Sequence, residues 1–148
     1  MTLQEQVAAD LADAMRARDD VRKSALRMLI AAIKNAEIEA RRPLEADAAL
    51  AVVQKQVKQR RESIVEFRKG NREDLVAKEE AELAVLSGYL PEEAPREEIE
   101  AAAREAIAAT GASGPRDLGK VMPALTKRFA GRADGRVISE IVRDLLGS

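Results

Sequence analysis

Apolar residues recur every three to four positions along nearly the whole chain, and this spacing is what most constrains its fold. Leu3, Val7, Leu11 and Ala14 show the pattern near the N-terminus. Such a period gathers side chains on one face of an α-helix, whereas a half-buried strand needs strict alternation, which no segment shows convincingly. The sequence therefore predicts an all-α fold.

Capping residues divide the first part of the chain into four expected helices. These helices are expected over residues 3–18, about 20–41, about 48–69 and about 72–87. Their expected N-terminal caps are Thr2 in a capping box with Glu5, then Asp19 or Asp20, Asp47 and Asn71. Each helix carries one apolar stripe, so together they predict a helical bundle over residues 1–90.

The stretch GYLPEEAP, residues 88–95, is the best candidate for a domain boundary because it is acidic and contains prolines. Beyond it we expect a three-helix subdomain over residues 95–148 with a Gly-rich basic loop. Its helices are expected from Pro95 to about Gly111, from Pro115 to Phe129, and after a cap at Asp134. Pro123 lies inside the second of these and is expected to kink or break it.

The composition fits a folded helical protein. Apolar residues make up 46% of the 148 residues, and 25 basic side chains nearly balance 26 acidic ones, which is not the signature of disorder. The longest uninterrupted apolar run, Met28–Ile33, is far too short to cross a bilayer, and Glu5 and Asp10 argue against a signal peptide. A cytoplasmic location without a membrane partner is the expectation.

The sequence contains no recognisable catalytic centre. It has no Cys and no His, which removes thiolate nucleophiles, the usual general base and the commonest metal ligand. Gly114 to Lys120 spells GxxxxGK, but Val121 occupies the position where a P-loop needs Ser or Thr. We therefore expect no catalytic residues, no metal site and no cofactor.

Four stretches, taken in order, resemble one protein family. They are LRMLIAAIKNAEIEARRPL, QKQVKQRRESIVEFRKGNREDLVAKEEAEL, YLPEE and GKVMPALTKRFAGRADGRVISEIVRDLL. Together they resemble the stand-alone YqeY-like members of the GatB/YqeY family over nearly the whole chain. In that family the same module forms the C-terminal tail of the B subunit of the tRNA-dependent amidotransferase, where it packs as two helical subdomains and contacts tRNA. The resemblance implies a link to tRNA, but not the kinase and amide-transfer chemistry, which resides in a separate domain without a counterpart here.

The segment from Arg116 to Arg136 concentrates positive charge. Its basic residues are Arg116, Lys120, Lys127, Arg128, Arg132 and Arg136, and its acids are Asp117 and Asp134, which leaves an excess of four positive charges. Glycines let a backbone approach a ligand closely, and helix N-termini favour anions. The segment is either a surface for RNA phosphates, with Lys120, Arg132 and Arg136 as the strongest candidates, or a solvated face with capping glycines.

A second set of cations lies on the expected helix over residues 20–41. Lys23, Arg27, Lys34 and Arg41 fall within about 40° on a helical wheel, opposite the apolar face. This row could follow the phosphates of a nucleic acid, or it could be the solvent side of an amphipathic helix.

Arg60 interrupts the apolar stripe of the third expected helix, between Val57 and Ile64. A cation there must extend to solvent or pair with a carboxylate. A structural ion pair is the favoured interpretation, with Glu37 or Glu79 as the possible partner.

These features leave alternative functions open. The leading hypothesis is an accessory module that binds tRNA or another structured RNA and is linked to aminoacyl-tRNA amidation; a ligase activity with glutamine as amido donor follows from the resemblance alone. The alternative is a protein-interaction module that docks on a translation enzyme without contacting RNA. An amidotransferase acting alone has no residues to support it. The aromatic residues Phe67, Tyr89 and Phe129 are too few to stack bases, so RNA would be recognised by shape and phosphate.

Overall fold

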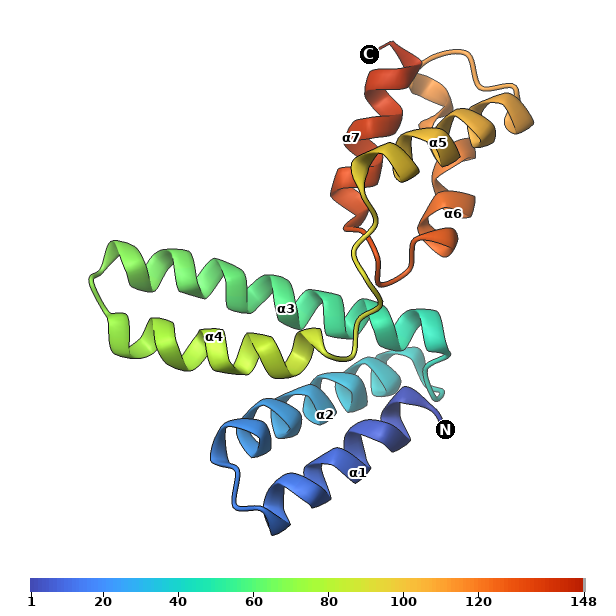
Figure 1. The fold of residues 1–148 in the computed structure, drawn as a ribbon. Coiled ribbons are helices and arrows are strands. Elements are labelled where there is room, and N and C mark those ends of the chain that lie inside the picture. The colour runs from blue at the N-terminus through green and yellow to red at the C-terminus, as the bar shows by residue number, and fades with distance from the viewer. Residues whose placement is uncertain (148) are drawn as a thin grey trace. The chain divides into compact units, whose positions relative to one another are not determined.

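A computed structural model describes residues 1–147, which form α-helices joined by short connections and one 3₁₀ helix (Figure 1). The elements are α1 (Leu3–Arg16), α2 (Asp20–Ala40), α3 (Ala46–Lys69), α4 (Glu73–Ser87), α5 (Arg96–Thr110), the 3₁₀ helix η1 (Pro115–Asp117), α6 (Leu118–Arg128) and α7 (Gly135–Leu146). The predicted all-α fold is confirmed. Within residues 1–147, no helix has both the length and the apolar character needed to span a membrane.

Side-chain caps fix where α1 and α2 begin. The predicted capping box is confirmed, since Thr2 Oγ1 accepts from the Glu5 amide at 3.1 Å and Glu5 Oε1 accepts from the Thr2 amide at 3.3 Å. Asp19 caps α2 by accepting from the Arg22 amide at 3.1 Å. Such bonds satisfy amides that have no partner inside the helix.

The predicted caps Asp47 and Asn71 are wrong. The N-cap of α3 is Glu45 and that of α4 is Arg72, and neither side chain makes a capping hydrogen bond. Asp47 lies instead in the first turn of α3, where its charge still suits the positive end of the helix dipole. Asn71 has a φ of 56° and lies in the turn between α3 and α4, a left-handed conformation that Asn tolerates.

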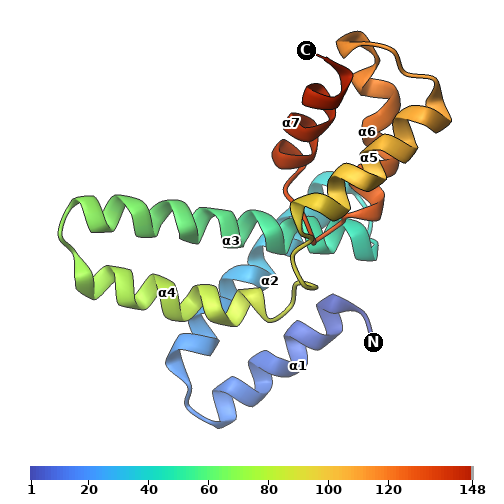
Figure 2. The same ribbon diagram turned by 45° about the horizontal axis from the view of Figure 1, so that its top comes forward.

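The N-terminal unit, Met1–Leu90, consists of two helical hairpins around one core. Helix α2 contacts α1, α3 and α4, and the α3–α4 turn extends beyond α2 in the views of Figure 1 and Figure 2. The core side chains with no exposed surface include Val7, Leu26, Leu29, Val53 and Leu86. These residues come from all four helices, so the apolar stripes meet in one place.

The C-terminal unit, from Pro91 onward, contains α5, α6 and α7, each of which contacts the other two. Its core includes Phe129, which has no exposed surface, together with Ile99, Val121, Ile138 and Val142. Helix α7 begins at the predicted cap, because Asp134 accepts a hydrogen bond from the Arg136 amide at 3.0 Å.

Pro123 does not break α6, which continues to Arg128, so a helix end at this residue is excluded. Proline removes the amide that would bond the carbonyl four residues earlier, here that of Gly119. Both Gly119 and Pro123 are exposed, so water can reach the carbonyl that loses its partner. The buried side of the same helix is held by Val121 and Leu125.

We predict that Leu26→Ala lowers the free energy of unfolding by about 2–5 kcal/mol, because it removes a fully buried side chain and leaves a cavity. Ile38→Ala, on the same helix, is the matched control: Ile38 is 73% exposed, and its loss should change stability by less than about 0.5 kcal/mol. Urea denaturation of the full chain followed by circular dichroism measures both. Equal effects of the two substitutions would contradict this core.

Candidate nucleic-acid interface

The outer face of α6 presents lysines to solvent. Lys120 and Lys127 lie within about 20° of each other on the helical wheel and are both exposed, whereas Val121 and Leu125 face the core. Arg116 precedes them on η1 and is exposed as well. Among the described residues, neither Arg116 nor Lys127 has an ion-pair partner. We refer to Arg116, Lys120 and Lys127 as the α6 cation face.

Lys120 is only loosely engaged. Its Nζ lies 3.3 Å from Asp117 Oδ1, one turn earlier, and its side chain is 65% exposed. Exposed pairs of this kind contribute little to stability and exchange readily with water or another anion. Asp117 has a separate structural role, since its carboxylate accepts from the Ser113 amide at 2.9 Å. That hydrogen bond, with Lys120 second, holds the pKa of Asp117 below its usual value.

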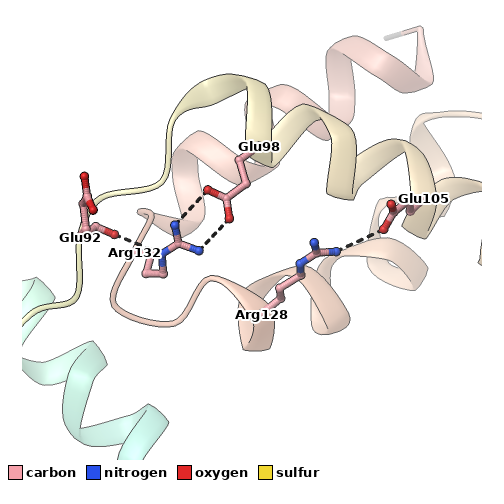
Figure 3. Close-up of polar contacts among 5 residues, drawn as sticks. All are labelled: Glu92, Glu98, Glu105, Arg128 and Arg132. Atoms are coloured by element: carbon pink, nitrogen blue, oxygen red, sulfur yellow. Dashed lines mark hydrogen bonds and ion pairs between the residues drawn. The ribbon is translucent and has the colours of Figure 1, made fainter.

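Arg132 joins three parts of the C-terminal unit. Its guanidinium makes a two-point contact with Glu98 of α5, at 2.8 and 2.9 Å, and its Nε donates to the Glu92 carbonyl at 3.1 Å (Figure 3). The hydrogen bonds from Arg132 also hold the pKa of Glu98 below its usual value. The Ala94 amide in turn donates to the Arg132 carbonyl at 2.8 Å. The guanidinium charge of Arg132 is therefore already paired with a carboxylate of the C-terminal unit.

Arg128 and Arg136 also have internal partners. Arg128 Nη1 lies 3.3 Å from Glu105 Oε2, as Figure 3 shows, and its guanidinium lies 5.7 Å from the centre of the Phe129 ring. Arg136 Nε lies 3.3 Å from Glu140 Oε1, but its side chain is 78% exposed. The Asp134 carboxylate occupies the N-terminus of α7, so the chain itself supplies the anion that this helix end favours.

The predicted row of cations on α2 contains fewer available residues than expected. Arg41 is the C-terminal cap of α2, with a φ of 56°, so it does not continue the helical row. Lys23 lies 3.6 Å from Asp20. Arg27 and Lys34 remain exposed on α2 without an ion-pair partner among residues 1–147. They form a minor basic surface on the N-terminal unit.

Arg60 is buried, with 5% of its surface exposed, and its predicted pairing with Glu79 is confirmed at 3.9 Å. Within residues 1–147, Glu37 makes no ion pair with Arg60; its carboxylate instead accepts from the Leu44 amide at 2.9 Å. A second acid, Glu82, was not predicted and lies 3.8 Å from Arg60 Nε. Its position three residues after Glu79, on the same side of α4, is the signal that could have identified it.

Two further features concern the acidic residues and the GxxxxGK segment. Within residues 1–147, no group of three or more acids could hold a metal ion. The GxxxxGK segment follows α5 and forms η1 and the start of α6, so it lacks the strand that precedes a phosphate-binding loop.

These features define a two-unit helical protein whose C-terminal unit exposes lysines and engages Arg128 and Arg132 internally. The sequence matches the family described as Yqey-like protein over residues 4–146, and the chain belongs to that family. The predicted family resemblance is thereby confirmed.

Relatives of similar sequence are fungal proteins named Altered inheritance of mitochondria protein 41, mitochondrial. The one from Pyrenophora tritici-repentis is 37% identical over 147 residues, covering 95% of this chain and 78% of the relative. The one from Eremothecium gossypii is 46% identical over 82 residues, covering 55% of this chain and 45% of the relative. The one from Lachancea thermotolerans is 45% identical, covering 55% and 44%. The match to the last two spans less than half of their length.

The predicted cytoplasmic location is wrong on this comparison, because the relatives are named as mitochondrial proteins. The prediction rested on the absence of a signal peptide and of a long apolar run. Neither feature separates one aqueous compartment from another, since a helical protein with balanced charge folds by the same burial of apolar surface in each.

We predict that Arg132→Gln raises the pKa of Glu98 toward its ordinary value. Because folding lowers this pKa, the pair stabilises the C-terminal unit above the unfolded-state pKa, about 4.3, and that contribution is lost as the pH falls through the folded-state pKa. In the variant, the loss of stability that accompanies protonation of Glu98 at acidic pH should be absent. NMR titration of the Glu98 carboxyl carbon, with thermal unfolding across the acidic range, measures both effects.

Arg104→Gln is the control for this experiment, since Arg104 is exposed on α5 and has no ion-pair partner among the described residues. It should leave the pKa of Glu98 unchanged. If Arg132→Gln also left it unchanged, the two-point contact would not exist in solution.

Proposed function

We propose that this protein is an accessory module that binds tRNA or a similarly structured RNA, and that the α6 cation face contacts its phosphates. The observation that carries the proposal is the exposure of Lys120 and Lys127 along one side of α6, whose other side is buried, with Arg116 exposed on η1 just before it. Cations presented in this way suit a polyanion, because each can neutralise one phosphate and release a counterion. The resemblance to the amidotransferase tail that contacts tRNA supports the same ligand.

The proposed contacts are to phosphate and sugar, not to stacked bases. Phe129 has no exposed surface, and Tyr89 packs against the core of the N-terminal unit while its hydroxyl donates to Asp10 Oδ2 at 2.5 Å. Neither ring is therefore available as a stacking platform of the kind that single-stranded RNA requires. A folded RNA recognised by its shape and backbone fits such a surface.

The proposed link to aminoacyl-tRNA amidation is that of an RNA-holding part, with the chemistry carried by another protein. The resemblance supplies this link, and the names of the fungal relatives mention no RNA. The alternative is a module that docks on a translation-related protein without contacting RNA. Arg132 is engaged by Glu98, whereas Arg128 and Arg136 are held only by exposed pairs at 3.3 Å, as Lys120 is, and they remain candidate contacts beside the α6 cation face.

We predict that Lys120→Gln with Lys127→Gln weakens tRNA binding and lowers the slope of log affinity against log salt by about 2, about 1 for each charge removed. Both side chains are exposed, so the variant should fold normally. Electrophoretic mobility titrations at several salt concentrations give the affinity and the slope.

Arg104→Gln with Arg143→Gln is the matched control, because it removes the same charge from exposed positions of the same unit on α5 and α7. It should leave most of the affinity intact. If the two variants lose affinity equally, RNA responds only to net charge and the α6 cation face is not the contact. If the intact chain binds no tRNA but co-purifies with a translation protein, the docking alternative holds.

A further inference from the structure

A cleft of about 640 Å³ lies within the N-terminal unit, between α2, α3 and α4. Its size falls in the range of ligand-binding clefts. Met28 of α2 and Phe67 of α3 provide apolar lining, and exposed residues such as Gln59 and Glu62 place part of its wall at the surface. The RNA-binding proposal makes no use of this cleft.

The cleft has Arg60 among its lining residues, and this guanidinium has too few acceptors. Its Nη1 donates to Gln56 Oε1 at 3.0 Å, while its Nε is buried and has no hydrogen-bond partner among the described residues. The nearest carboxylate oxygens, from Glu79 and Glu82, lie 3.9 and 3.8 Å from Nε. A buried charge that is incompletely hydrogen-bonded costs stability, so its retention calls for a reason.

Met28 covers another part of the same guanidinium. Arg60 Nη2 lies 3.2 Å from the Met28 sulfur, and Met28 is 48% exposed. A thioether is a weak acceptor on a flexible side chain. An incoming carbonyl oxygen could therefore displace it and give Nη2 a stronger partner.

The net charge of the cleft lining indicates whether its ligand is a cation or an anion. Glu62, Glu66, Glu79 and Glu82 face Arg60 and Lys78 in the lining, and Glu66 also pairs with Lys69 at 3.2 Å, so one negative charge remains in excess when Lys69 is counted. Glu82 is fixed in place, since it is 3% exposed and accepts from the Ser24 hydroxyl at 3.1 Å. Such a lining repels phosphate and attracts a cation.

We propose that this cleft is a docking site for a basic peptide segment of a partner protein. A Lys or Arg side chain of the segment is held by the carboxylates at the mouth, and a backbone carbonyl replaces the Met28 sulfur on Arg60. A basic residue within a peptide carries both groups, a cation and a neutral acceptor. A free carboxylate or phosphate would instead add negative charge to a lining that already has an excess.

The test uses the full chain and a blocked peptide in which two lysines and two arginines alternate with glycines. The peptide is titrated into the millimolar range and followed by amide NMR. Shifts should concentrate on the cleft residues of α2, α3 and α4. Glu62→Gln with Glu66→Gln, both exposed positions, should weaken binding about fivefold, as expected for two partly exposed ion pairs.

Glu39→Gln with Glu45→Gln is the matched control, because these acids are exposed elsewhere in the same unit. It should leave the affinity within about twofold. The same peptide with glutamates in place of its basic residues should not bind. The proposal is overturned if the basic peptide shifts no cleft residue, if both Gln pairs weaken it equally, or if inorganic phosphate or tRNA shifts the cleft residues instead.

Discussion

The packing of the N-terminal unit depends on how one buried cation is accommodated. Arg60 lies in the middle of the buried face of α3, where an apolar side chain would be expected, and its partners come from α2, α3 itself and α4. Apolar contacts between helices tolerate small shifts, but a guanidinium needs acceptors at defined positions. The α4 carboxylates of Glu79 and Glu82 lie 3.9 and 3.8 Å from Arg60 Nε, so the register of α4 against α3 determines how the buried charge is compensated.

The C-terminal unit uses an arginine in a comparable way. Arg132 follows α6 and reaches Glu98 on α5 and the Glu92 carbonyl before it. The planar guanidinium suits such two-point contacts, whereas a lysine ammonium is a flexible, strongly hydrated charge. Within the basic segment Arg132 makes such a two-point contact, whereas Lys120 and Lys127, together with Arg116, remain exposed. Counting charges along the sequence cannot make that distinction.

Most of the fold and part of the candidate site could be predicted from the sequence. Helix starts were predictable at Thr2 and Asp19, where a side chain caps the helix, and not for α3 and α4, whose N-caps make no such bond. The ion pairing of Arg60 was the favoured interpretation of its place in an apolar stripe, and the pair with Glu79 confirms it. The choice of Glu82 depends on the register between two helices, and the pairing of Arg132 joins residues 34 positions apart. Local periodicity places Glu82 on the same side of α4 as Glu79, but it does not show that this side meets Arg60, nor that Arg132 meets Glu98.

The α6 cation face and the cleft of the N-terminal unit carry net charges of opposite sign. This difference determines which ligands each surface can bind. A phosphate backbone approaching the α6 cation face meets exposed lysines whose present contacts are weak, so binding requires little rearrangement. The same backbone at the cleft would meet surplus carboxylates around a guanidinium that is already flanked by two of them. Repulsion there grows as water is excluded, because charges interact more strongly at low dielectric. A single ligand chemistry cannot satisfy both surfaces, so a protein that uses both must bind an anion at one and a cation at the other.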